Sequence, residues 1–131
     1  MERRIVNPWT WQDEFGFVQA NEVVGAERVL VCSGQTSVDA DGQPLHEGNM
    51  SAQVAQAIDN LEIVLTAAGF TLADVVRLNY YVTDVEAFLE ADQGSDARLA
   101  RAGCLAASTL LGVSRLAIPS LMVEIEATAV R

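Results

Sequence analysis

The chain has 131 residues, half of them hydrophobic, and carries 18 acidic against 8 basic side chains, for a net charge of −10 at pH 7. This charge opposes binding to a phosphate backbone, and no apolar run approaches the roughly 20 residues that span a bilayer, so we expect neither nucleic-acid nor membrane partners. The length fits one domain over residues 1–131 that buries roughly two thirds of its unfolded surface.

The first predicted element is a short apolar run over residues 28–34 that ends at Gly34, the pattern of a buried strand that leads into an open turn. Backbone donors are expected to be exposed at that turn. Cys32 is expected to be a small buried hydrophobe. Neither Cys32 nor Cys104 has metal-ligand spacing, and the amino terminus lacks an apolar signal core, so we predict free thiols in a reducing, cytoplasmic setting.

The segment 39–42 predicts a tight turn, because its closing Asp-Gly pair tolerates positive φ. A calcium loop is the competing interpretation. An EF-hand aligned on Gly42 needs a glutamate six residues later, where Gly48 stands, and Pro44 would break the loop. We therefore predict no metal site.

The clearest helix spans residues 51–68, where apolar residues recur at steps of three and four. They are Val54, Ala57, Ile58, Leu61, Val64, Leu65 and Ala68. Either Asn49 or Ser51 can accept the unpaired amide hydrogen bonds at its start. Gly69 suits the left-handed residue beyond its end.

A strand with one polar side is predicted over residues 75–83, where apolar Val76, Leu78, Tyr80 and Val82 alternate with Arg77, Asn79 and Tyr81. Asp84 then suits the N-cap of a helix over residues 85–103. The Gln-Gly-Ser sequence at 93–95 predicts that this helix is broken or kinked, or forms two short helices.

The last predicted strands cover residues 108–113 and 121–130, with a turn near Pro119. In the final strand a period of two places Glu124, Glu126 and Thr128 on one side. The apolar alternates should face a core, whereas the carboxylates should meet solvent, a polar cleft or another subunit.

This order of elements predicts an α+β fold, a two-layer sandwich with two helices on one face of a mixed sheet. The polar side of the sheet would be open in a monomer, which favours contact between subunits. Trp9 and Trp11 are interpreted as packing of an edge strand, with the rim of a hydrophobic cleft as the alternative.

Four segments together resemble the RidA/YjgF family, also labelled L-PSP endoribonuclease. They are Val31–Gly42, Asn60–Gly69, Tyr81–Val85 and Val123–Ala127. The resemblance covers most of the chain and implies a chorismate-mutase-like protomer. It also implies a homotrimer with small-molecule clefts between subunits. In active members, a water attacks the imine tautomer of an enamine and releases ammonia and a 2-keto acid without a cofactor.

The resemblance also implies where the site lies. Phe17 falls where many members carry a tyrosine, and Asp92 lies near the family's site asparagine. Ser33 and Gly34 keep the turn that lines the cleft. The remaining site residues are Glu124, which matches the glutamate thought to position or activate water, and Leu110, which matches a residue whose backbone carbonyl contributes to that water site.

Ser108 aligns with the arginine that holds the substrate carboxylate in the family. Losing such charge-assisted hydrogen bonds, each worth on the order of 1.5–3 kcal/mol, should weaken binding of a 2-imino acid by about tenfold to a thousandfold or more. Arg115 would lie roughly 23 Å further along an extended chain. Ser108 is not expected to be a nucleophile, because the sole histidine, His46, lies in a predicted loop.

Three functions remain open. One is a cofactor-free hydrolytic deaminase of an imine or enamine other than a simple 2-imino acid, with Glu124 guiding water. Another is a non-catalytic small-molecule binding or regulatory trimer, and a purely assembling scaffold is the third. Ribonuclease activity is disfavoured by the acidity and by the absence of a paired histidine or lysine site.

Overall fold

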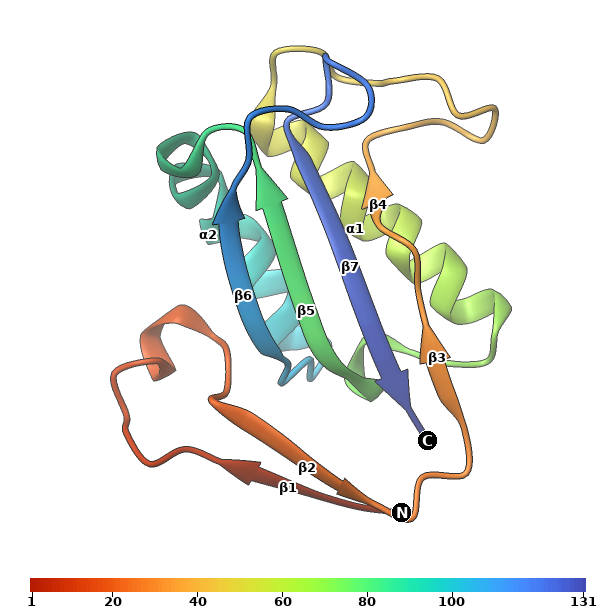
Figure 1. The fold of residues 1–131 in the computed structure, drawn as a ribbon, viewed down its shortest axis with the longest axis vertical. Coiled ribbons are helices and arrows are strands. Elements are labelled where there is room, and N and C mark those ends of the chain that lie inside the picture. The colour runs from red at the N-terminus through yellow and green to blue at the C-terminus, as the bar shows by residue number, and fades with distance from the viewer.

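The computed structural model describes residues 1–131 apart from the side chains of residues 92–96. A twisted sheet is covered on one face by helices, and a separate hairpin lies at one end (Figure 1). The strands are β1 (Glu2–Val6), β2 (Ala20–Val24), β3 (Val29–Val31), β4 (Gln35–Thr36), β5 (Val75–Val82), β6 (Ala107–Gly112) and β7 (Val123–Val130). The helices are α1 (Met50–Ala67) and α2 (Val85–Arg101), with 3-10 turns η1 (Asp13–Phe15) and η2 (Leu72–Asp74).

The main sheet has the order β3-β7-β5-β6, with β4 paired to β7 beside β3. Strand β7 is antiparallel to β3, β4 and β5, whereas β5 and β6 are parallel. A parallel pair needs a crossover connection, and α2 supplies it. The mixed sheet with α1 and α2 on one face confirms the predicted α+β sandwich (Figure 1).

The alternation predicted for the last strand is confirmed. Its apolar alternates are at most 3% exposed, whereas its polar alternates are half-buried on the other face. The buried set is Val123, Ile125, Ala127 and Ala129. Strand β5 departs from its predicted alternation at one point: a bulge between Val75 and Arg77 buries Val75 and leaves Val76 only half-buried. A bulge adds one residue to a strand and so reverses the faces of the residues before it.

Helix α1 begins as predicted. The side chain of Asn49 accepts a hydrogen bond from the amide of Ala52 at 3.0 Å, which decides between Asn49 and Ser51 as its cap. Gly69 has φ +80°, the left-handed conformation expected after the helix end. Arg28 then donates to the carbonyl of Ala68 at 2.6 Å, so the last turn is tied to the chain just before β3.

Helix α2 also begins at the predicted cap, because the Asp84 side chain accepts from the amide of Ala87 at 3.0 Å. It runs as one element from Val85 to Arg101 rather than as two short helices. Within the part of the chain that the structure describes, no helix has the length and apolar character needed to cross a membrane.

The predicted turn is present, since the amide of Gly42 donates to the Asp39 carbonyl at 3.0 Å and Gly42 has φ +79°.

The hairpin of β1 and β2 was not predicted from the sequence. It is held to the end of the sheet by side chains and, just before β2, by a single backbone bridge between Val18 and Ala107, rather than by a strand ladder. Arg3 donates to the carbonyls of Ala73 and Leu105, at 2.9 and 2.6 Å. Asn21 donates to the carbonyls of Val76 and Leu105, both at 2.9 Å. The segment between β1 and β2 is thereby brought beside the start of β6.

The edge-strand interpretation of the two tryptophans is wrong. Trp9 and Trp11 lie in the loop before η1, and each is 58% exposed. Trp11 nevertheless packs edge-on against Phe17, with ring centroids 5.8 Å apart. The loop therefore supports a residue that the resemblance places in the ligand site.

Candidate functional site

Two pockets lie on opposite faces of the main sheet. Tyr80 pairs in register with Leu110 of β6 and Ile125 of β7, on the face that α1 and α2 cover. Tyr81 pairs with Glu124. Because successive side chains of a strand point to opposite faces, Tyr80 and Leu110 face the helices, whereas Tyr81 and Glu124 face away from them.

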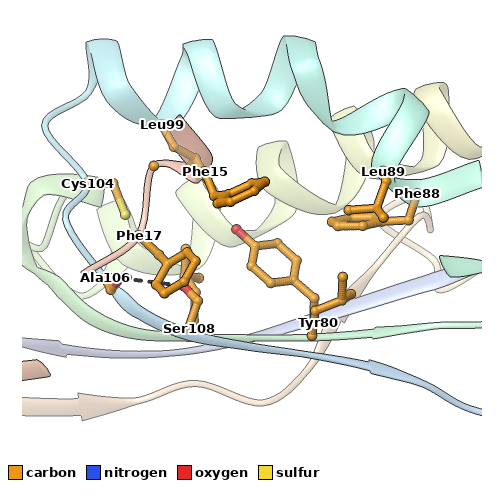
Figure 2. A pocket seen from close by; sticks show the side chains of 12 residues that line it. Phe15, Phe17, Tyr80, Phe88, Leu89, Leu99, Cys104, Ala106 and Ser108 are labelled. Atoms are coloured by element: carbon orange, nitrogen blue, oxygen red, sulfur yellow. Dashed lines mark hydrogen bonds between the residues drawn. The ribbon is translucent and has the colours of Figure 1, made fainter. Parts of the chain in front are cut away.

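The pocket on the helix side, called here the aromatic cavity, lies between α2, the sheet and residues 15–17. Its volume is about 310 Å³, at the lower end of the range for small-molecule sites. Figure 2 shows Tyr80 standing up from the sheet between Phe15 and Phe88, with Phe17 and Ser108 on one side. The lining residues are Phe15, Gly16, Phe17, Leu78, Tyr80, Phe88, Leu89, Leu99, Cys104, Ala106, Ser108 and Leu110.

The polar atoms of the aromatic cavity are few. The Ser108 hydroxyl donates to the Ala106 carbonyl at 3.5 Å, at the long limit of a hydrogen bond. The Tyr80 ring packs on Phe88 with centroids 5.3 Å apart. Burial raises the pKa of the Cys104 thiol to about 11, so this group is neutral at physiological pH. The cavity is therefore an apolar, low-dielectric environment.

Three of the expected site residues, Phe17, Ser108 and Leu110, lie together in this cavity. The side chain of Asp92 falls outside the described residues, so the expectation for it stays a prediction. The sequence analysis did not assign Phe15, Tyr80, Phe88, Leu99 or Cys104 to the site. Except for Phe15, which lies in η1, these residues follow the apolar spacing that is also typical of an ordinary core. That spacing could not distinguish residues lining a cavity from residues filling the core.

The pocket on the open face, called here the acidic pocket, contains the other expected residues. Gly34, Tyr81, Val113, Arg115, Leu116, Glu124 and Glu126 line it. Ser33 is exposed beside Gly34 and lines neither pocket. The two halves of the expected site are therefore separated by the sheet within one protomer.

Glu124 lies directly over Gly34. A Cβ atom at position 34 would come within 2.6 Å of Cδ and 2.7 Å of Cγ of Glu124, distances that real contacts do not show. Only glycine leaves room for the glutamate side chain in this position. In the described part of the chain, the Glu124 carboxylate accepts no hydrogen bond, so it is available to a ligand or a water.

Glu126 is held differently. Its carboxylate accepts hydrogen bonds from the Tyr81 hydroxyl at 2.5 Å and from the Asn79 amide at 2.9 Å. The Tyr81 bond, followed by the Asn79 bond, lowers the pKa of Glu126 below its usual range. The same bond raises the pKa of Tyr81. Glu126 therefore remains charged and occupied, and is a weaker candidate for a base.

We expect Tyr81→Phe to raise the pKa of Glu126, because it removes the main group that stabilises the carboxylate. A carboxylate whose pKa is lower in the folded than in the unfolded protein stabilises the fold at pH values above its unfolded pKa. This stabilisation is lost as the pH falls through the folded pKa. The stability lost on this substitution should thus be visible at neutral pH and shrink on acidification. Carbon-detected NMR titration of the carboxyl group checks this. Tyr80→Phe, on the opposite face, should leave the pKa unchanged; an unchanged Glu126 in Tyr81→Phe would contradict the assignment.

Arg115 is the cation of the acidic pocket. Strand β6 ends at Gly112, and the chain then turns back so that Arg115 lies with Glu124 and Glu126. Its guanidinium donates to the carbonyls of Leu116 and Ala117, each at 3.1 Å. Arg115 does not line the aromatic cavity, so within one protomer it cannot supply the charge that Ser108 lacks. With two carboxylates and one guanidinium, the acidic pocket has an excess of negative charge.

A metal centre has no support in the described side chains, where no three Asp, Glu, His or Cys groups converge. The fold and the two pockets define an α+β protein of the chorismate-mutase-like class. The family model described as Endoribonuclease L-PSP matches residues 15–131. The chain therefore belongs to the RidA/YjgF family, as the sequence motifs predicted.

Three relatives place the chain within this family. A crystal structure of a protein of unknown function of the conserved Rid family, YyfB from Yersinia pestis, is 39% identical with a TM-score of 0.89, and all of both chains is covered. The 2-iminobutanoate/2-iminopropanoate deaminase of Salmonella typhimurium is 30% identical over 104 residues, which is 79% of this chain and 80% of the relative. The mitochondrial protein mmf1 of Schizosaccharomyces pombe is 38% identical over 68 residues, 52% of this chain but only 41% of the relative.

Proposed function

We propose that this protein is a RidA/YjgF-type homotrimer with small-molecule clefts between its subunits, and that it hydrolyses an imine or enamine other than a simple 2-imino acid. The observation that carries the proposal is the Glu124 carboxylate, held over Gly34 and open to a ligand. A relative named as a 2-iminobutanoate/2-iminopropanoate deaminase supports the reaction class. A cytoplasmic setting stays a prediction.

The separation of the two pockets supports a site shared between subunits. The aromatic cavity and Glu124 lie on opposite faces of one sheet, so a ligand in the cavity cannot meet the Glu124 of its own protomer. A second copy can present its acidic pocket to the cavity. The open face also carries exposed apolar side chains, with Val29, Val31 and Leu111 at 62%, 77% and 49% exposure. Such a surface favours burial between copies.

The chemistry needs one base and one water. Glu124 accepts a proton from the water as its oxygen adds to the imine carbon. Glu124 returns this proton to the imine nitrogen, which gives a neutral carbinolamine. The hydroxyl proton of the carbinolamine then passes through Glu124 to the nitrogen as the C=O bond forms and the C–N bond breaks, and the nitrogen leaves as ammonia. The other product is an aldehyde or ketone. Each step balances without a cofactor, and an apolar cavity excludes competing water from the bound substrate.

The proposal is tested by ammonia release. Freshly generated 2-aminoacrylate and an N-unsubstituted imine without a carboxylate, acetophenone imine, are supplied to this protein and to the Salmonella deaminase. We expect the protein to accelerate ammonia release from acetophenone imine and to be nearly inert on 2-aminoacrylate. Ser108→Arg should gain activity on 2-aminoacrylate, because it restores a charge-assisted contact to the carboxylate.

Two outcomes would change the assignment. Turnover of 2-aminoacrylate by the unmodified protein at the rate of the Salmonella enzyme would show that Ser108 does not prevent 2-imino acid hydrolysis. Saturable binding of a small molecule without turnover of either imine would favour the non-catalytic binding trimer. The apolar lining of the cavity is the observation that favours this non-catalytic binding function as the second candidate.

A further inference from the structure

The aromatic cavity has an electrostatic character that limits what it can hold. None of the described residues that line it carries a charge. The Cys104 thiol is neutral because burial raises its pKa to about 11. The carboxylates of Glu124 and Glu126 lie on the opposite face of the sheet. A charged ligand group that enters the cavity therefore meets no counter-ion among the described side chains.

The cation that acts on Cys104 is already occupied. Arg3 acts electrostatically on Cys104, but its guanidinium donates to the carbonyls of Ala73, Val75 and Leu105, at 2.9, 3.2 and 2.6 Å. Those bonds hold the β1–β2 hairpin against the sheet. Arg3 therefore has a structural role and does not substitute for a ligand-binding arginine.

The arrangement of side chains around the cavity favours a ligand that carries an aromatic ring. Aromatic side chains bound it on several sides, with Phe15 and Phe17 from the segment after the first loop, Phe88 from α2 and Tyr80 from β5 (Figure 2). Such rings favour edge-to-face or offset contact with another aromatic group. Two hydroxyls lie among the lining side chains, those of Tyr80 and Ser108 (Figure 2). The 3.5 Å bond of the Ser108 hydroxyl to Ala106 is weak enough to be exchanged for a ligand acceptor.

From these observations we infer that the aromatic cavity takes an uncharged single-ring molecule, with the ring among Phe15, Phe17 and Phe88 and a carbonyl or similar acceptor at the Ser108 hydroxyl. The inference rests on the proposed function in treating the cavity as part of the ligand site, and it names the substrate class. Substrates would be neutral aryl-substituted imines, and products the corresponding aldehydes or ketones. A carboxylate in the same place would be desolvated without a partner, a loss of at least about a hundredfold in affinity.

The test uses two stable ligands that differ in charge and little else. The uncharged 3-phenylpropanamide and the anionic 3-phenylpropanoate are titrated into the protein at neutral pH, with binding followed by calorimetry and ligand-observed NMR. We expect saturable binding of the amide, at least about a hundredfold tighter than that of the carboxylate. Ser108→Arg should reverse the preference, because a guanidinium pairs with the anion.

A second variant tests the location without entering the core. Leu89 lines the cavity yet is 53% exposed, so it lies at the mouth. Leu89→Trp should narrow the entrance and weaken amide binding at least about tenfold, since an overfilled site forces its neighbours to shift. Ile63→Trp is the matched control, because Ile63 is an exposed apolar residue of α1 that lies outside the cavity lining. It should leave the affinity unchanged.

Three results would overturn the inference. They are equal or tighter binding of 3-phenylpropanoate, no saturable binding of either compound, and amide binding that neither Ser108→Arg nor Leu89→Trp alters. None of them depends on catalysis. Ammonia release from imines judges the proposed function separately, so the protein could fail the binding test and still be a deaminase, or bind the amide and prove inert.

Discussion

Glu124→Gln should reduce ammonia release from the imine substrate by about 100- to 10,000-fold, the usual contribution of a positioned acid or base. Glutamine keeps the length and shape of the side chain over Gly34 but cannot accept the proton of the attacking water. Substrate affinity should change little, since the substitution leaves the aromatic cavity intact. The expected pattern is a loss of kcat with an almost unchanged KM, measured by coupled ammonia detection.

Glu126→Gln is the matched control for this prediction. It makes the same chemical change two residues away, on the same strand and the same face. The Glu126 carboxylate is engaged by Tyr81 and Asn79, so we expect a decrease of no more than severalfold. Equal losses in the two variants would assign the effect to the charge of the pocket. An unaffected Glu124→Gln enzyme would remove Glu124 from the mechanism.

Gly34→Ala offers an independent test of the same group. The added methyl would collide with Cγ and Cδ of Glu124, so the carboxylate must leave its position. The cost in stability should be about 0.5–1.5 kcal/mol, because the side chain can turn to a less favourable rotamer. Activity should fall nearly as far as in Glu124→Gln. In a double-mutant cycle with Glu124→Ala, the stability cost of Gly34→Ala should disappear; persistence of that cost would place the strain elsewhere.

Much of the fold could be predicted because its signals are local. The alternation in β7, the three- and four-residue steps in α1 and the Asp84 cap are each contained in a short window of sequence. The β1–β2 hairpin was missed for the opposite reason. Its position depends on bonds from Arg3 and Asn21 to carbonyls more than 50 residues away, and no short-range pattern records them.

The site was harder to predict than the fold, because a sequence motif identifies site residues but does not show on which face of the sheet each one lies. Phe17, Ser108 and Glu124 came from one family site, yet the sheet separates Glu124 from the other two. The alternation of β7 shows that Glu124 faces away from the core. Combined with an aromatic cavity on the core side, that fact indicates that one chain does not contain the whole site.

The position of Arg115 shows that a distance estimated along an extended chain fails where the chain turns back. The distance of Arg115 along the extended chain was considered only from Ser108. Strand β6 ends at Gly112, and residues 113–122 turn back toward β7, which brings Arg115 into the pocket of Glu124. The glycine at 112 and the proline at 119 were the available signals for that reversal.

Val31→Glu should convert the assembled protein to folded monomers. Val31 is 77% exposed on the sheet face opposite the helices, and its pairing partner Thr128 belongs to the same face as Glu124. If copies pack through this face, a glutamate there would be buried without a counter-ion, a penalty of several kcal/mol repeated at each subunit contact. Sedimentation equilibrium should show a mass three times that of one chain for the unmodified protein and one chain for the variant.

Ile63→Glu is the matched control for Val31→Glu. Ile63 is 66% exposed on α1, so the same substitution adds the same charge to an exposed apolar position without touching the open sheet face. Ile63→Glu should leave both the mass and ammonia release unchanged. Val31→Glu should lose ammonia release together with the assembly but keep its circular dichroism spectrum.

A monomeric unmodified protein, or a Val31→Glu variant that stays assembled, would contradict packing through this face. A monomer that still hydrolyses the imine would refute a cleft shared between subunits, because the sheet separates its own Glu124 from its own aromatic cavity.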